Sequence, residues 1–294
     1  MTTHPSSPVV VGVDGSEASF AAVRLAAREA GFRGRSLRVV HAFVWPLVQA
    51  TMAGVPRPEP DAEMRRDAEQ IVRDAVAEAT KADPELAVTG DLVTGGAGGA
   101  LVDASRDAVL VVLGDRGLGG FTGLLVGSVA VQVAAHGSCP VLVARGREHA
   151  SGPVVVGVDG SATSDAAVQM AFEEASARGA ELVAVHFWTG PVSTGPGDML
   201  PLVYDYDDVE ADEVRLLAES IAGWRERYPE VPVTRRVIRG HPAHGLVDES
   251  VQAQLLVVGA RGRGGFTALL LGAVSQAVLH HATCPVAIVR TPRP

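Results

Sequence analysis

A glycine-rich segment carries the residues of this chain that are best suited to holding a ligand. It runs from Gly114 through Gly117 to Gly127 and Ser128, where a helix is predicted to start. Glycines let the backbone approach a ligand closely and adopt positive φ. Backbone N–H groups at a helix start form a cradle for phosphate, to which the Ser128 hydroxyl and the Arg116 cation would add. The spacing indicates a phosphate site, with a plain turn and helix cap as the architectural alternative.

An aspartate, Asp14, is a second residue that we expect to contact the same ligand. Asp14 directly follows the apolar run Val9–Val13, and the glycine-rich segment follows a similar run at residues 109–113. Such short runs are typical of strands covered on both faces in a parallel sheet. Ligands of these sheets bind beyond the carboxyl ends of the strands, where the strand order reverses. We therefore expect Asp14 to lie beside the glycine-rich segment and to accept hydrogen bonds from a ribose or to influence a metal ion.

The whole chain is one unit written twice. Residues 11–16, Val-Gly-Val-Asp-Gly-Ser, return unchanged at 156–161, and other landmarks recur at the same offset. Each half is long enough to bury its own core. We therefore predict two domains, residues 1–147 and 148–294, which meet in the linker-like stretch 146–153.

Strands alternate with helices in each half. Apolar runs predict buried strands, and apolar residues at i, i+3, i+4 and i+7 predict helices. In the first half, the predicted strands are Val9–Val13, Leu37–Phe43, 86–93, 109–113 and Val141–Ala144. The predicted helices follow Ser16 and Pro60 and span 99–106 and Ser128–His136. This alternation gives right-handed parallel crossovers. The predicted fold class is α/β, with two tandem doubly wound domains, each a five-stranded parallel sheet with helices on both faces.

Charge and composition exclude several classes of protein. A formal net charge of −9 argues against broad binding to nucleic acid or to an anionic membrane, both of which need basic patches. No apolar stretch reaches the roughly 20 residues that span a bilayer. The first residues lack the basic region and apolar run of a secretory signal. The sequence therefore predicts a cytoplasmic protein with no nucleic-acid partner and no membrane partner.

Familiar nucleotide-binding and catalytic motifs are absent from the sequence. Lys81 is the only lysine, so the two halves cannot both carry a phosphate-binding loop of the Walker type. No G-x-G-x-x-G motif opens the first helix, and no G-x-S-x-G nucleophile elbow occurs. Without a recognisable general base, nucleophile or phosphate-clamping lysine, the sequence predicts no catalytic residues.

The glycine spacing and its flanking motifs resemble one known family. The pattern G-x2-G-x9-G-[S/T] is the ATP-binding signature of the universal stress protein family, and the segment from Gly114 to Ser128 fits it at every position. The Val-Gly-Val-Asp-Gly-Ser opening, the strand with His41 and the closing Cys-Pro-Val also resemble that family. The resemblance extends over both halves, so the chain is similar to a tandem universal stress protein.

The resemblance implies which residues would surround an ATP molecule in each half. In the first half, the adenine and ribose would lie near Gly12, Val13, Asp14 and Ala42, and the phosphates near Gly114, Gly117, Gly127, Ser128 and Val129. The matching positions of the second half are Gly157, Val158, Asp159, Phe187, Gly259, Gly262, Gly272, Ala273 and Val274.

The resemblance also implies a function. The family typically binds ATP with Mg²⁺ or Mn²⁺, often dimerises through its last strand, and acts in stress adaptation or growth control. We therefore expect an ATP-binding regulatory stress protein that forms a homodimer, contacts an unidentified protein partner and shows little or no turnover. No separate metal site is expected. Two alternatives stay open, a nucleotide-independent interaction or chaperone-like module and a slow ATPase.

The second half departs from the signature. Ala273 replaces the Ser/Thr, which removes a hydroxyl donor to phosphate that contributes about ten- to a hundredfold in affinity. Phe187 replaces Ala42 and would either crowd the base or stack on it. In the first half, Asp115 puts a carboxylate beside the phosphate loop, where it would repel phosphate or help to hold a metal. The loss at Ala273 predicts that the first site binds ATP at least as tightly as the second.

Four other residues receive structural interpretations. His41 and His186 end predicted buried strands, where a hydrogen-bonded core histidine is the expected role. Cys139 and Cys284 precede the last strand of each half and are expected to be small buried residues without a disulfide.

Two further groups, four histidines and four loop residues, have side chains that could bind a ligand. The paired histidines of the second half lack a third ligand at helpful spacing, so no metal site is expected at His241, His244, His280 and His281. Four loop residues would either cover the nucleotide or simply pack, and these are Trp45, Met52, Tyr204 and Tyr206.

Overall fold

The structure is a computed structural model. It describes residues 7–43, 62–118, 126–147, 149, 151–189, 206–263 and 270–291. The chain divides into two compact units, Met1–Ala144 and Arg145–Arg293.

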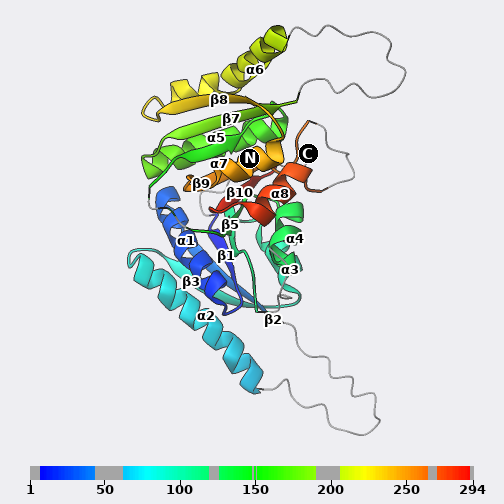
Figure 1. Cartoon of the computed structure of the whole chain (residues 1–294). Coiled ribbons are helices and arrows are strands. Elements are labelled where there is room, and N and C mark those ends of the chain that lie inside the picture. The colour runs from blue at the N-terminus through cyan, green and yellow to red at the C-terminus, as the bar shows by residue number, and fades with distance from the viewer. Residues whose placement is uncertain are drawn as a thin grey trace, which may run out of the picture. The chain divides into compact units, whose positions relative to one another are not determined.

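The first unit is a parallel α/β sheet with helices on both faces. Its strands are β1 (Val9–Val13), β2 (Leu37–Phe43), β3 (Val88–Thr94), β4 (Leu110–Gly114) and β5 (Val141–Ala144). Its helices are α1 (Glu17–Arg33), α2 (Ala62–Ala82), α3 (Ala97–Ala104) and α4 (Ser128–His136). The strands lie in the order β3-β2-β1-β4-β5, and every neighbouring pair is parallel. Helices α1 and α2 cover one face and α3 and α4 the other, as Figure 1 shows.

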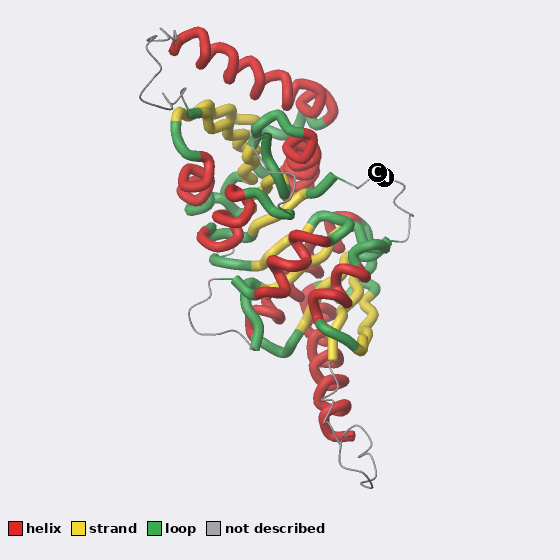
Figure 2. Tube along the Cα trace, turned by 90° about the vertical axis from the view of Figure 1, so that its right-hand side faces the viewer, coloured by secondary structure: helices red, strands yellow, loops and turns green. Residues whose placement is uncertain are grey.

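The second unit repeats this plan. Its strands are β6 (Val154–Gly157), β7 (Leu182–Trp188), β8 (Val233–Arg239), β9 (Leu255–Gly259) and β10 (Val286–Val289). Its helices are α5 (Ala162–Arg178), α6 (Tyr206–Arg227), α7 (Pro242–Glu249) and α8 (Ala273–His281). The strand order is β8-β7-β6-β9-β10, again parallel throughout. Figure 2 shows the alternation of strands and helices along the trace. The predicted fold class is confirmed.

Local signals fix the first turn of each unit. Gly15 and Gly160 have φ of +85° and +71°, which only glycine adopts readily. The backbone of each unit therefore turns sharply after its first strand. The hydroxyls of Ser16 and Ser161 then cap α1 and α5 by accepting a backbone N–H three residues on. These caps explain why the two long helices start at matched positions.

Three predicted elements have different bounds in the structure. Strand β3 begins at Val88 rather than at residue 86, because the Leu86 N–H donates to the Asp83 carbonyl in a turn. Helix α3 begins at Ala97 rather than at residue 99, since the Gly96 carbonyl already accepts the first helical hydrogen bond. Strand β4 lies one residue later than predicted.

The two strand histidines are hydrogen-bonded, as expected, and His186 is buried whereas His41 is half-buried. In each, ring nitrogen Nδ1 donates to a backbone carbonyl, from His41 to Val13 at 2.7 Å and from His186 to Val158 at 2.6 Å. These bonds hold the end of the second strand against the first. In the second unit, Nε2 of His186 also lies 2.8 Å from a carboxylate oxygen of Glu213 on α6.

No helix in the part of the chain that the structure describes has the length and apolar character needed to cross a membrane.

The two cysteines provide a test of the packing. Cys139 and Cys284 are buried and free, and burial raises the pKa of each thiol to about 12. Only the thiolate reacts, so at pH 8 nearly all of each thiol is in the unreactive protonated form. We expect the folded protein to resist a thiol reagent such as DTNB at pH 8. Both thiols should react once urea unfolds the chain, and rapid labelling before unfolding would contradict this burial.

Candidate functional site

The first unit has a pocket at the carboxyl edge of its sheet, where the strand order reverses between β1 and β4. The pocket has a volume of about 340 Å³. Every first-half residue implied by the resemblance lines it, namely Gly12, Val13, Asp14, Ala42, Gly114, Gly117, Gly127, Ser128 and Val129. The fold therefore brings together residues from β1, β2, β4 and α4 that lie far apart in sequence.

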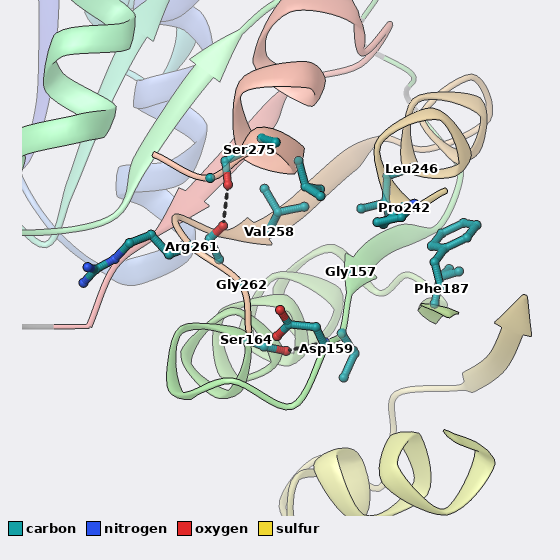
Figure 3. Close-up of a pocket in the computed structure, with 16 residues that line it drawn as sticks. Gly157, Asp159, Ser164, Phe187, Pro242, Leu246, Val258, Arg261, Gly262 and Ser275 are labelled. Atoms are coloured by element: carbon teal, nitrogen blue, oxygen red, sulfur yellow. Dashed lines mark hydrogen bonds between the residues drawn. The ribbon is translucent and has the colours of Figure 1, made fainter. Parts of the chain in front are cut away.

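The second unit has a matching pocket of about 540 Å³. It too is lined by every residue that the resemblance implied, namely Gly157, Val158, Asp159, Phe187, Gly259, Gly262, Gly272, Ala273 and Val274. Figure 3 shows Phe187, Pro242 and Leu246 gathered on one side of this pocket and Arg261 on the opposite side.

One wall of each pocket was not predicted. Ala97 and Leu101 of α3 line the first pocket, and Pro242 and Leu246 of α7 line the second. These residues are four apart on one helical face, and the matched apolar pair in both halves was the available signal. The sequence placed a short helix there, but its position over β2 and β7 depends on packing.

The aspartate after the first strand joins two loops. One oxygen of Asp14, Oδ1, accepts hydrogen bonds from the backbone N–H and hydroxyl of Ser16, at 3.0 and 2.6 Å. The other, Oδ2, accepts the backbone N–H of Leu118 at 2.8 Å. Asp159 likewise accepts the N–H groups of Ser161 at 2.9 Å and Arg263 at 3.0 Å. Both oxygens therefore bond to protein, and the contacts that the structure shows for this residue position the loops.

These hydrogen bonds stabilise the charged form of Asp14. Burial alone raises the pKa of its carboxyl, but the hydrogen bonds from Ser16 and Leu118 outweigh burial and hold the pKa below its ordinary value. The carboxylate therefore stays ionised at neutral pH.

Packing requires two of the loop glycines in the first unit. A Cβ on Gly117 would lie 2.3 Å from Oδ2 of Asp14, and one on Gly114 would lie 2.8 Å from the backbone of Ala18. The expectation that these glycines adopt positive φ is wrong, because neither they nor Gly127 are among the glycines with positive φ. They are bare because other atoms approach them closely.

Gly127 and Gly272 differ from the other loop glycines. Their φ values of −68° and −73° suit any residue, and a Cβ on either would have no atom of its surroundings nearer than 3.5 Å. Each is the N-cap of a helix, α4 or α8, without a side-chain hydrogen bond to that cap. The first N–H groups of a helix have no acceptor within it. A Cβ at either glycine would therefore make only ordinary contacts, and both glycines line a pocket beside backbone donors without a side-chain cap.

A cation accompanies each pocket. Arg116 and Arg261 line the two pockets and are exposed, and within the described ranges their guanidinium groups make no hydrogen bond or ion pair. Among those same residues no three His, Cys, Asp or Glu side chains gather to hold a metal ion. The sites thus offer donors and positive charge to an anion rather than ligands to a cation.

The hydroxyl groups at the helix starts are arranged differently in the two units. Ser128 lines the first pocket and is exposed, and its matched residue is Ala273. Two positions on, Ala130 is matched by Ser275, whose hydroxyl lies 2.8 Å from the Gly259 carbonyl and 3.0 Å from the Ala260 carbonyl. The Ser275 hydroxyl is bonded to its own loop, so it does not replace that of Ser128.

Some predicted lid residues cannot be placed. Trp45, Met52 and Tyr204 lie outside the described residues, and Tyr206 starts α6 but its side chain is not described.

The loop-joining role of Asp14 predicts a pH-dependent loss of stability. Asp14→Asn replaces one acceptor oxygen by an N–H₂ group that opposes a backbone N–H, so we expect unfolding in urea at pH 7 to require about 1.5–3 kcal/mol less. A carboxyl whose folded pKa is depressed stabilises the fold above its unfolded pKa and loses that effect as pH falls. The difference between parent and variant should therefore stay constant from pH 7 to 5 and shrink below pH 3.8. A difference that grew with acid would contradict this role.

Comparison with known proteins assigns the family. The chain matches the universal stress protein family over residues 6–145 and again over 151–290. It is 41% identical over 289 residues to a universal stress protein of Mycolicibacterium smegmatis, with 96% of each chain covered. It is 43% identical over 294 residues to universal stress protein Rv2005c of Mycobacterium tuberculosis, again with 96% of each covered.

A solved structure agrees on the fold. The crystal structure of a universal stress protein from Archaeoglobus fulgidus DSM 4304 matches with a TM-score of 0.69 at 21% identity, covering 98% of this chain and 97% of that chain. Together with the two matches of the family along the sequence, these likenesses show that the chain belongs to the universal stress protein family.

Proposed function

We propose that this protein binds adenine nucleotides, ATP foremost, in both pockets and acts as a regulatory stress protein. Family membership and the gathering of the implied residues around each pocket support this proposal. The phosphates would lie against the helix starts at Gly127 and Gly272, and the base would lie near Ala42 and Phe187.

Gly127 and Gly272 are the observation that carries the proposal. Glycine is a favoured N-cap residue, and at these two positions it borders a pocket and leaves the helix start without a side-chain cap. The positive end of the helix dipole and its free N–H groups favour an anion. A phosphate that approaches the backbone at these points accounts for the missing side chains.

The surrounding residues fit a phosphate chain with its own cation. The Ser128 hydroxyl and Arg116 would add donors to the N–H groups of the first site. Mg²⁺ or Mn²⁺ would arrive bound to the phosphates, since the described residues offer no cluster of ligands for it. We propose little or no turnover, because both oxygens of Asp14, the carboxylate of this pocket lining, already accept hydrogen bonds from protein.

The regulatory part of the proposal concerns assembly. We propose that the chain forms a homodimer and that bound nucleotide alters its contact with a protein partner. Light scattering of the purified protein with and without Mg-ATP reports the mass of the assembly in each state.

The nucleotide content of the purified protein tests the proposal. We expect up to two ATP molecules per chain on denaturation, or on saturation with Mg-ATP in a calorimeter. If the protein contains no nucleotide and takes up none, the proposal fails, and the nucleotide-independent interaction module becomes the better account. Release of ADP and phosphate at a steady rate would instead favour a slow ATPase.

Substitutions at the two helix-capping glycines should each remove one site. Gly127→Val and Gly272→Val add a side chain at the helix start that lines one pocket, with a stability cost of about 1 kcal/mol because φ suits valine but valine is a poor N-cap. Each variant should lose one bound ATP, and the double variant both, with thermal unfolding little changed.

A second glycine of the same loop, Gly117, serves as the control. Gly117→Ala places a methyl group against Asp14, so it should lower stability as well as nucleotide binding. If Gly127→Val binds two ATP molecules per chain, the phosphates do not lie at this helix start.

A further inference from the structure

The second pocket has two chemically different ends. One end is the uncapped start of α8, where Ala273 and Val274 line the pocket. The other end is an apolar wall made by Phe187, Pro242 and Leu246, which Figure 3 shows on the side away from Arg261. An occupant that fits both ends carries an anionic group on one side and a flat apolar group on the other.

Phe187 packs in this wall against Gly245 of α7, which we call the seat of the ring. Its ring lies so close to Gly245 of α7 that a Cβ there would be 2.1 Å from Cε1 and 2.3 Å from Cζ. In the first unit the matched residues are Ala42 and Ala100, so a large and small pair replaces two small residues. The ring lines a pocket of about 540 Å³, against about 340 Å³ in the first unit. Of the two expectations for Phe187, this larger volume favours stacking over crowding.

The anionic end of the second pocket is weaker in side-chain donors. Ser128 presents a hydroxyl to the first pocket, and that hydroxyl makes no hydrogen bond within the described part of the chain. Ala273 has none to offer, and the hydroxyl of Ser275 is bonded to its own loop. The second pocket therefore offers an anion mainly the backbone donors of α8, since the Arg261 guanidinium points away from the other labelled residues in Figure 3.

From these differences we propose that Phe187 sets the ligand preference of the second pocket by stacking on the base. The second pocket then retains a nucleoside with few or no phosphates, whereas the first pocket depends on phosphates through Ser128. This inference rests on the proposed function and assigns different preferences to its two sites.

The expected sizes of the two effects decide which quantity to measure. Stacking of a base on an aromatic ring contributes about five- to 150-fold in affinity. A hydroxyl donor to phosphate contributes about ten- to a hundredfold. For ATP these effects oppose each other between the two pockets. The ratio of the dissociation constants for adenosine and ATP within one pocket separates them.

Full-length chains with a single working pocket allow that ratio to be measured. Gly272→Val leaves the first pocket and Gly127→Val leaves the second. Calorimetric titration of each chain with adenosine, AMP and Mg-ATP gives the dissociation constants. We expect the ratio of adenosine to ATP constants to be at least about tenfold larger in the first pocket than in the second.

Variants of Phe187 separate stacking from simple packing. In the Gly127→Val chain, Phe187→Leu keeps apolar bulk but removes the aromatic face, so adenosine should bind at least about fivefold more weakly. Phe187→Tyr keeps that face and should bind adenosine within about twofold of the parent. Thermal unfolding of each variant checks that the unit still folds. Ala273→Ser is the control at the other end and should strengthen ATP binding while leaving adenosine unchanged.

Two substitutions can introduce the aromatic ring and its neighbouring glycine into the first pocket. Ala42→Phe together with Ala100→Gly, in the Gly272→Val chain, recreates the ring and its seat. Ala42 lines the first pocket, and Ala100→Gly removes the methyl group at the position where Gly245 lies against the ring in the second unit. This variant should bind adenosine at least about fivefold more tightly than its parent.

The outcomes distinguish the two proposals. If neither single-pocket chain binds ATP, the proposed function itself fails. If both bind ATP but their ratios are equal, or Phe187→Leu binds adenosine as its parent does, only the assignment of Phe187 is overturned.

Discussion

Each pocket depends on one carboxylate, Asp14 or Asp159, that joins the loops after the first and fourth strands of its unit. The chain leaves β1 toward α1 on one face of the sheet and leaves β4 toward α4 on the other, which opens a crevice between the loops. Asp14 spans that crevice by accepting the N–H of Leu118, and the same hydrogen bonds keep the carboxyl ionised. Gly117 must be bare because the carboxylate lies against it. The first turn of the loop after β4 is therefore held by a hydrogen bond to Asp14, and its glycines Gly114 and Gly117 do not adopt positive φ.

This contact leaves the side chains around the pocket free to differ. Asp159 makes the same bond to a backbone N–H, although the residue there is Arg263 in place of Leu118. A bond to the backbone does not depend on residue type, so the frame survives changes that alter charge or size. The two pockets consequently share a backbone and differ in Ser128 against Ala273 and in Ala42 against Phe187.

The sequence was sufficient for the architecture because the central strands are buried and short. Val9–Val13 and Leu37–Phe43 match their predicted bounds, since a continuous apolar run between turn residues has few other uses. The start of β3 was misplaced because Leu86 is apolar but belongs to a turn. The resemblance predicted which residues line the pockets. It did not reveal the close contacts that require glycine at positions 114 and 117. A bond between Asp14 and Leu118 joins residues too distant for any local pattern to reveal.

The exchange of Ala42 for Phe187 changes the lining of the pocket within the same backbone frame. Gly245 lies inside α7, where glycine costs about 1 kcal/mol relative to alanine. A methyl group at that position would overlap the ring, and a glycine without the ring would leave a void, so the two residues make sense only together. The ring recovers part of this cost by packing on the helix. Its remaining face borders the pocket and stays only half-buried, so that apolar surface is stabilised when a flat group covers it. The seat at Gly245 is thus best understood as support for a ring whose other side awaits a ligand.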